Sequence, residues 1–224
     1  AIRQEAPEAE IDFLHLDVSS DASVKAAAQA VAEKYGTDPP PLYGIVNNAG
    51  LGFDKAMPEV LGVNVYGAKR VSEAFLPLLQ KGGRIVNTGS ASGPMFIARE
   101  GGEYKRVLCN PGVTWPEIEE MIQRTLPTGK EAYGFSKACL MAHTMDLARR
   151  NPDLVVNACT PGFILTDITR GMGATKKPEE GTKAAIHCLT AEMEGNGRYY
   201  GSDAVRSPLD RYRGPGDPEY KGDY

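Results

Sequence analysis

A tyrosine and a lysine four residues apart, Tyr133 and Lys137, are the most specific chemical signal in the sequence. On a helix this spacing places both side chains one turn apart on the same face, so the hydroxyl and the ammonium can act together. A free phenol has a pKa of about 10, and a nearby cation lowers that value by favouring the phenolate. Tyr133 could then work as a general acid or base. The same spacing also occurs on exposed helices without function, so it needs support from its surroundings.

Four further motifs supply that support. They are Asn47-Asn48-Ala49-Gly50, Asn64 in Asn64-Val65-Tyr66-Gly67, Ser90 in Asn87-Thr88-Gly89-Ser90-x-x-Gly93, and Pro161-Gly162. Taken singly, the first and last motifs would be ordinary turns. Taken in this order with Tyr133 and Lys137, the set resembles the short-chain dehydrogenase/reductase family from about residue 10 to residue 203. The long stretch between Ser90 and Tyr133 resembles the insertion of the monomeric carbonyl reductases.

This resemblance implies roles for four catalytic residues. Ser90 would hydrogen-bond the substrate carbonyl, and Tyr133 would protonate its oxygen as hydride arrives. Lys137 would hold the ribose hydroxyls of the cofactor and lower the Tyr133 pKa. Asn64 would position a water beside Lys137 and complete a proton relay. The implied reaction is hydride transfer from NADPH to a ketone or aldehyde. The choice of NADP(H) rests on the subgroup alone and leaves NAD(H) open.

The resemblance also implies a set of cofactor contacts, which includes Tyr133 and Lys137. It places Asp17 and Val18 at the adenine ring, Asn47, Ala49 and Gly50 along the adenosine, and Pro161, Gly162, Ile164 and Thr166 around the nicotinamide. Glycine suits two of these positions, because a backbone without Cβ can approach a flat ligand closely. No metal site is expected, because the four cysteines and three histidines are scattered without ligand spacing.

The scaffold that must position these residues alternates strands with helices. The predicted strands are 11–16, 42–46, 84–88, 154–158 and 199–200. The first predicted helix is capped by Ser20 or Asp21 and runs to about Tyr35, with Gly36 as its stop. The other predicted helices span 60–79, 131–150 and 178–192. Lys81-Gly82-Gly83 is predicted to close the second helix. This alternation predicts a Rossmann-type doubly wound parallel α/β sheet with flanking helices. Ligands bind beyond the carboxyl ends of such strands, where the motifs lie.

The sequence predicts one catalytic domain over residues 1–206, with an insertion at 94–130 and a C-terminal tail at 207–224. Thr114 is the expected N-cap of an amphipathic helix in the insertion. Its apolar face would hold Ile118, Met121, Ile122 and Leu126. We hypothesise that this helix covers the face that tetrameric relatives use for association, which predicts a monomer. The tail lacks apolar periodicity and is expected to wrap the surface or to be disordered.

One part of the family pattern is missing from the N-terminal side. No Gly-x-x-x-Gly-x-Gly precedes Asp17, so the first βαβ segment, whose glycine-rich turn would receive the pyrophosphate, is absent. The family's strand order would place the missing strands between the strand ending at Leu16 and the strand ending at Val46. We therefore expect the 224 residues to be a fragment of a longer chain, because the remaining sheet would have a hole.

Composition narrows the partners. The net charge of −4 and the pI near 5.5 give no basic field for nucleic acid or anionic lipid, and no apolar run is long enough for a bilayer. We expect a cytoplasmic enzyme whose partner is a small carbonyl substrate. Two alternatives stay open: an NAD(P)-dependent alcohol or steroid dehydrogenase of the same fold, and a non-catalytic truncated family member that serves as a binding or scaffold subunit.

Overall fold

The computed structural model describes residues 8–224 and has a four-stranded parallel sheet in the order β1-β2-β3-β4. The strands are β1 (Leu42–Asn47), β2 (Leu79–Thr88), β3 (Val155–Cys159) and β4 (Tyr199–Tyr200). Each neighbouring pair is parallel, as helical crossovers between strands require. The structure thus confirms the predicted doubly wound α/β class.

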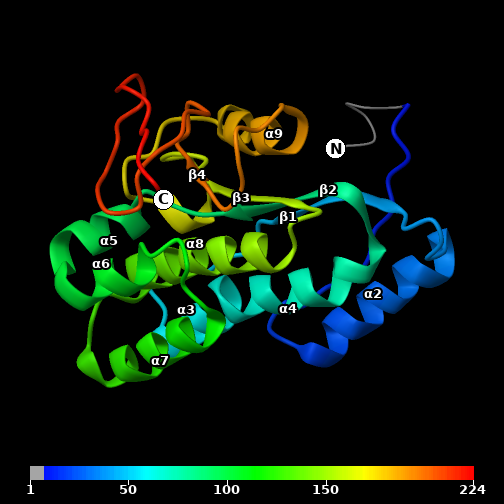
Figure 1. Cartoon of the computed structure of the whole chain (residues 1–224), viewed down its shortest axis with the longest axis horizontal. Coiled ribbons are helices and arrows are strands. Elements are labelled where there is room, and N and C mark those ends of the chain that lie inside the picture. Colours follow the sequence, from blue (N-terminus) through cyan, green and yellow to red (C-terminus); the bar gives the residue numbers. More distant parts are fainter. Residues whose placement is uncertain (1–7) are drawn as a thin grey trace.

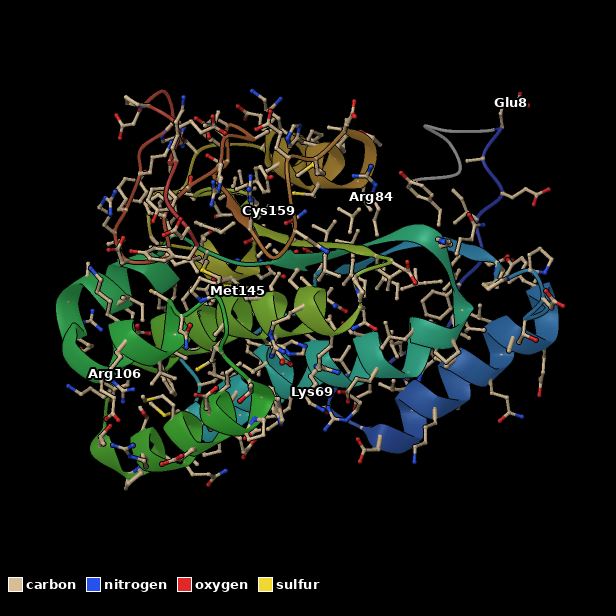
Figure 2. All side chains as sticks on the ribbon, in the orientation of Figure 1. Glu8, Lys69, Arg84, Arg106, Met145 and Cys159 are labelled. Carbon is tan, nitrogen blue, oxygen red and sulfur yellow. The ribbon has the colours of Figure 1, made fainter. Side chains whose placement is uncertain are left out.

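Helices lie on both faces of this sheet (Figure 1). One face carries α4 (Tyr66–Phe75) and α8 (Ala132–Arg150), and α9 (Lys183–Thr190) lies on the other. Figure 2 shows Met145 of α8 below the sheet and Cys159 at the sheet beneath α9. Cys159 packs there in a small core with Cys188 of α9 and Tyr200. Both faces of the central strands are therefore buried, as expected for a parallel sheet.

The longest helix, α8, forms the centre of the main core. Glu131 caps its start, because its carboxylate accepts hydrogen bonds from the backbone amides of Tyr133 at 2.6 Å and Gly134 at 2.8 Å. Every residue from Gly134 to Ala148 is buried. The helices that surround it on this side are α3 (Met57–Asn64), α5 (Ser92–Glu100), α6 (Gly102–Leu108) and α7 (Trp115–Thr125). The predicted 131–150 helix is confirmed, and its position is fixed on all sides.

Helix α2 (Asp21–Tyr35) also follows the prediction. The Ser20 hydroxyl accepts from the Ser23 amide at 3.3 Å, and Gly36 ends the helix with a φ of 82°. Such an angle favours glycine because it has no Cβ to clash. The predicted helix at 178–192 begins instead as a 3₁₀ turn (Pro178–Thr182), and its α-helical part is α9.

The predicted strand at 11–16 is wrong, because no strand forms between residues 8 and 20 of the described chain. Strands are stabilised by a hydrogen-bonded neighbour. Within residues 8–224, β1 pairs with β2 and has no second strand partner. Beside β1 lies a hollow of about 350 Å³ that is also lined by Leu16 and Val18. Phe13 is 92% exposed. The expectation that the chain is a fragment stays a prediction.

The single helix predicted at 60–79 is also wrong. It is divided into α3, α4 and a short 3₁₀ turn (Leu76–Leu78), with the break at Val65. The glycines predicted to close that helix lie inside β2, whose register with β1 shifts near Gly44. A Cβ on Gly83 would lie 2.7 Å from the Gln80 carbonyl oxygen. These glycines therefore mark a bulge in a strand rather than a helix end.

The insertion packs inward as predicted. Thr114 and Glu117 form a reciprocal capping box at the start of α7, and Ile118, Met121 and Ile122 are buried. Leu126 follows in a 3₁₀ turn and is partly buried against the same core. The tail wraps the body and is ordered, with Ser207, Leu209 and Arg213 buried. Among the described residues, no helix combines the length and apolar character needed to cross a membrane.

Candidate active site

A groove of about 810 Å³ runs across the carboxyl ends of β1, β2 and β3. It is lined by Tyr133 and Lys137 and by predicted cofactor residues from the loops after β1 and β3: Ala49, Gly50, Pro161, Gly162, Ile164 and Thr166. Parallel strands bring their carboxyl ends to one edge, which is why segments distant in sequence meet here. The structure therefore assembles most of the predicted site.

Lys137 lies at the base of this groove and is 4% exposed. Its ammonium donates to the Thr88 carbonyl oxygen at 2.7 Å and lies 5.6 Å from the centre of the Tyr133 ring. Burial lowers the pKa of Lys137 to about 8, because the charged form is removed from water. A buried cation with one backbone partner retains donors for a ligand in the groove.

Ser90 lies close enough to Tyr133 to act on the phenol. Burial raises the pKa of Tyr133, and the neighbouring Ser90 hydroxyl opposes that shift. The nearby Lys137 ammonium was expected to lower the Tyr133 pKa. In the structure without ligand, desolvation outweighs any such effect. The phenol therefore holds its proton at neutral pH, as a proton donor must.

The Phe53 ring covers Tyr133 from the loop before α3, with the ring centres 4.3 Å apart. Ser90 is fixed from its own loop, since it accepts from the Ser92 amide and donates to the Ser92 hydroxyl, both at 3.2 Å. Phe53 and Ser92 were not singled out from the sequence. Phe53 belongs to no motif, and Ser92 fills a variable position of the Ser90 motif, so only the fold places them beside the Tyr133 and Ser90 hydroxyls.

Asn64 is brought to the site but is held by protein partners. Its Oδ1 accepts from the Leu51 amide at 2.8 Å, while its Nδ2 donates to the Leu51 carbonyl at 3.1 Å and to the Ser136 hydroxyl at 3.0 Å. Ser136 in turn donates to the Tyr133 carbonyl at 2.7 Å. The amide thus ties the loop after Gly50 to helix α8 and fixes the distance between groove wall and Tyr133.

Two glycines make the groove accessible to a flat ligand. A Cβ on Gly50 would lie 3.4 Å from Asn64 Oδ1 and 3.7 Å from Lys137 Nζ, inside the space above the lysine. Gly162 has a φ of 89°, which favours glycine, and a Cβ there would lie 3.0 Å from Ser202 Cβ. The nicotinamide and ribose half of a dinucleotide therefore fits the residues present: an open cradle, a buried ammonium and two hydroxyls.

The predicted adenine end is less complete. The Asp17 carboxylate accepts from the Ser19 amide at 2.9 Å and from its hydroxyl at 2.7 Å, so it organises the start of α2. Val18 and Asn47 line the hollow beside β1, which adjoins the main groove at Ala49. The Asn47 amide donates to Ser72 and Asn87 inside the protein. Asp17 and Asn47 are not brought into the large groove.

Several groove residues received no role from the sequence. Thr88 and Asn48 stand in two of the sequence motifs at the carboxyl ends of β2 and β1, where ligands bind. Thr88 supplies the carbonyl that holds Lys137, and Asn48 accepts from the Thr88 hydroxyl at 3.2 Å. Ile186 and Leu189 of α9 close the far wall. Nothing in their helical pattern distinguishes such a wall from ordinary core packing.

Comparisons with known proteins agree with this geometry. The short chain dehydrogenase family model matches residues 1–101. (+)-Neomenthol dehydrogenase of Arabidopsis thaliana is 30% identical over 217 residues, which cover 78% of this chain and 71% of that protein. Carbonyl reductase (NADPH) 1 of Rattus norvegicus is 26% identical over 200 residues, which cover 78% and 70%.

A solved structure extends the comparison to the fold. Salutaridine reductase from Papaver somniferum superposes with a TM-score of 0.73 at 24% identity, covering 88% of this chain and 84% of that structure. That likeness shows the fold, and the 30% identity to (+)-neomenthol dehydrogenase identifies the chain as a member of the short-chain dehydrogenase/reductase family, NAD(P)-binding oxidoreductases, and within it as similar to the carbonyl reductases.

Proposed function

We propose that this chain is an NADPH-dependent carbonyl reductase that converts a ketone or aldehyde to an alcohol. The observation that carries the proposal is the buried Lys137 ammonium in the groove, 5.6 Å from the Tyr133 ring centre, with Ser90 near the same phenol. Two hydroxyl donors directed at one point can bind a single carbonyl oxygen. The choice of NADPH is supported by the name of the rat relative.

The residues divide the work of the reduction. NADPH, when bound, supplies a hydride to the carbonyl carbon. Tyr133 gives its proton to the carbonyl oxygen, so the products are an alcohol and the oxidised cofactor. Ser90 donates a hydrogen bond to the same oxygen and stabilises the charge that develops there. A Tyr133 pKa raised by burial favours this direction, because the acid is fully protonated before the reaction.

Lys137 has two tasks in this scheme. Its ammonium would hold the ribose hydroxyls in the groove, and it would stabilise the Tyr133 phenolate left after proton transfer. Asn64 would keep the loop at Gly50 in place through Leu51 and would support a water that returns a proton from solvent. Asp17, Val18, Asn47, Ala49, Pro161, Ile164 and Thr166 remain the proposed contacts along the rest of the cofactor.

The first test is a titration of NADPH into the purified chain, followed by nicotinamide fluorescence, with NADH in parallel. We expect saturable binding of NADPH that Lys137→Ala weakens. A panel of ketones, aldehydes and the matching alcohols then measures turnover in both directions. A folded chain that binds neither nucleotide would overturn the proposal. Turnover of alcohols alone would favour the dehydrogenase alternative, and binding without turnover would favour a non-catalytic subunit.

We also propose that the protein is a monomer with a small-molecule partner. The apolar face of α7 is buried within the protein, where Ile118, Met121 and Ile122 pack in the main core. Tyr66 of α4 donates to Glu119 of α7 at 2.9 Å and packs edge-on against Trp115. These contacts leave no apolar stripe on α7 for a second copy. Sedimentation velocity should give a single monomeric species, and a stable tetramer would contradict the proposal.

A further inference from the structure

We propose that the C-terminal tail forms a wall of the substrate cavity and that Tyr212 is a specificity-determining residue for the carbonyl compound. This inference rests on the proposed reductase function. It concerns a segment, residues 207–217, that follows the last strand and takes no part in the cofactor groove.

A second hollow of about 420 Å³ lies next to the cofactor groove and shares Gly162 with it. Ser90 lines this hollow and Tyr133 lines the groove, so the two proposed donors to the carbonyl come from adjoining spaces. Three large apolar side chains line its walls beside polar ones that include Arg211 and Arg213: Met95 comes from α5, Phe163 from the loop after β3, and Tyr212 from the tail. A hollow of this size suits a small organic molecule.

The three apolar side chains are about half exposed, at 53% for Met95, 47% for Phe163 and 57% for Tyr212. Exposed apolar side chains that gather around a cavity mark a binding surface more often than a structural one. Each comes from a different segment, so no local packing explains their grouping. A substrate with a flat or bulky apolar group would cover all three while its carbonyl reached Ser90.

Tyr212 of the tail and Tyr133 both lie near a third tyrosine, Tyr199. Burial raises the pKa of Tyr199, which lines the same hollow, and the phenols of Tyr212 and Tyr133 both add to that shift. The buried Tyr199 phenol therefore lies near both Tyr212 of the tail and Tyr133. The tail wall and Ser90 line one hollow, and that hollow shares Gly162 with the groove that Tyr133 lines.

A nearly buried ion pair holds the tail in this position. The Arg213 guanidinium donates to Asp203 at 3.0 and 2.6 Å, and also to the Pro218 carbonyl at 3.2 Å. Asp203 further accepts from the Gly216 amide at 3.0 Å. The pair's side chains are 5% and 18% exposed. A bidentate, low-exposure pair of this kind fixes geometry more than it adds stability.

The Arg213–Asp203 ion pair, called the clamp below, closes over Gly201. A Cβ there would lie 2.8 Å from Asp203 Oδ1, 2.9 Å from Arg213 Nη1 and 3.0 Å from Ser207 Oγ, so only glycine lets the pair close. Because Tyr212 immediately precedes the clamped arginine, its side chain is presented to the hollow from a fixed backbone. The tail is therefore a rigid wall and not a loose flap.

The test measures kcat/KM for a compact monocyclic aryl ketone and a tricyclic ketone in wild type, Tyr212→Ala and Tyr212→Phe. Loss of the ring removes wall contacts to the compact ketone and opens space for the large one. We expect the ratio of the two kcat/KM values to shift about tenfold toward the tricyclic ketone in Tyr212→Ala, since losing apolar pocket contacts has effects of that order. Tyr212→Phe keeps the wall and should keep the wild-type ratio.

Tyr220→Ala is the matched control, because Tyr220 is a tail tyrosine that stacks on Tyr224 and does not line the hollow. Its ratio should not change. Arg213→Lys keeps the charge but loses the bidentate geometry, so it should shift the ratio in the same direction as Tyr212→Ala. NADPH affinity, measured by fluorescence, should be the same in all variants.

The outcomes separate this inference from the proposed function. Wild type that turns over carbonyls while Tyr212→Ala keeps the wild-type ratio overturns the wall and leaves the reductase intact. Wild type that binds NADPH and reduces no carbonyl defeats the reductase proposal itself. A shift in Tyr212→Ala without one in Arg213→Lys supports the wall and contradicts the clamp.

Discussion

The two ends of the cofactor groove are built differently. At the α8 end, every residue from Gly134 to Ala148 is buried, and the Tyr133, Lys137 and Asn64 side chains each have fixed neighbours. At the end beside β1, residues 8–20 form no strand, and Phe13 is 92% exposed. Order there comes from local contacts, such as the Asp17 carboxylate on Ser19 and the Arg70 guanidinium on the Val18 carbonyl.

This difference separates chemistry from cofactor capture. The proposed proton donor and the buried ammonium lie on α8, which is packed on all sides, and the proposed carbonyl donor Ser90 lies in the short loop between β2 and α5, so their geometry would be preorganised. The contacts proposed for the adenine lie on a segment whose position depends on side-chain caps. Damage at the α8 end should therefore abolish turnover or folding, whereas damage at the β1 end should change binding with little effect on the rest.

The largest effect should follow from Tyr133→Phe. Removing one hydroxyl takes away the proposed acid and leaves the packing against Phe53 intact. We expect kcat to fall by about 10²- to 10⁴-fold, the usual contribution of a general acid. Carbonyl reduction measured with NADPH in steady state checks the rate. NADPH affinity should stay near the wild-type value, and a parallel loss of binding would mean that Tyr133 acts through the cofactor site.

Folding stability should show the same contrast between the two ends. Phe96→Ala opens a cavity in the main core, where Phe96 is 1% exposed and packs against Tyr104 and Phe135. We expect the free energy of unfolding to fall by about 3–5 kcal/mol. The matched variant Phe13→Ala should change it by less than about 0.5 kcal/mol. Urea denaturation followed by circular dichroism measures both, and equal losses would contradict the comparison.

The same contrast explains what could be predicted from sequence. The helix at 21–35 and the Tyr133–Lys137 face were predictable because a cap residue, a terminal glycine and a four-residue spacing are local signals. The strand at 11–16 was not, since a strand depends on a partner that periodicity cannot supply. The bulge at Gly82 and Gly83 was mistaken for a helix end, because glycine indicates an unusual backbone conformation but not whether a helix or a strand contains it.

The roles of several site residues could not be predicted from motifs. Thr88 acts through its backbone carbonyl, which any residue could provide. Phe53 and Tyr212 lie on irregular loops whose position depends on the whole fold. The motif indicated Asn64 as a site residue, and its bonds to Leu51 and Ser136 show a tie between two walls rather than a free amide. Motif residues locate a site, and packing decides how each side chain is used.

The pH dependence of NADPH binding should show a smaller effect at the α8 end. Burial lowers the pKa of Lys137 from 10.5 to about 8 in the chain without ligand. Below that pH the ammonium is charged and can bind the ribose; above it the amine is neutral. We expect affinity to be constant up to about pH 8 and then to fall by up to tenfold per pH unit, as one lost proton requires.

Fluorescence titrations at several pH values check this expectation, and Lys137→Met should remove the dependence. The folding linkage has the opposite sign. Because the folded pKa lies below the unfolded value of 10.5, the buried charge costs stability below about pH 8. That cost is relieved as pH rises from about 8 to 10.5. A binding profile that stays flat to pH 10 would contradict the proposed contact between Lys137 and the cofactor.

The smallest effects should come from two helix caps, one at each end of the molecule. Thr114 caps α7 through Glu117, and Ser20 caps α2. Replacing either residue by alanine costs about 1 kcal/mol of helix stability. The two losses should appear in different measurements. Helix α7 contributes Ile118, Met121 and Ile122 to the main core, so Thr114→Ala should lower the global free energy of unfolding.

Helix α2 fully buries only Val24 and Ala27, and several of its other apolar residues are partly buried in the same cluster with α4 and β1. Because this packing is much lighter than that of α8, we expect α2 to open without unfolding the sheet. Ser20→Ala should therefore speed amide hydrogen exchange within residues 21–35 and leave exchange in α8 unchanged, because weakly packed elements open as separate units. If Ser20→Ala instead accelerated exchange in α2 and α8 equally, the two ends of the groove would form one cooperative unit, and cofactor capture and chemistry would be coupled through folding.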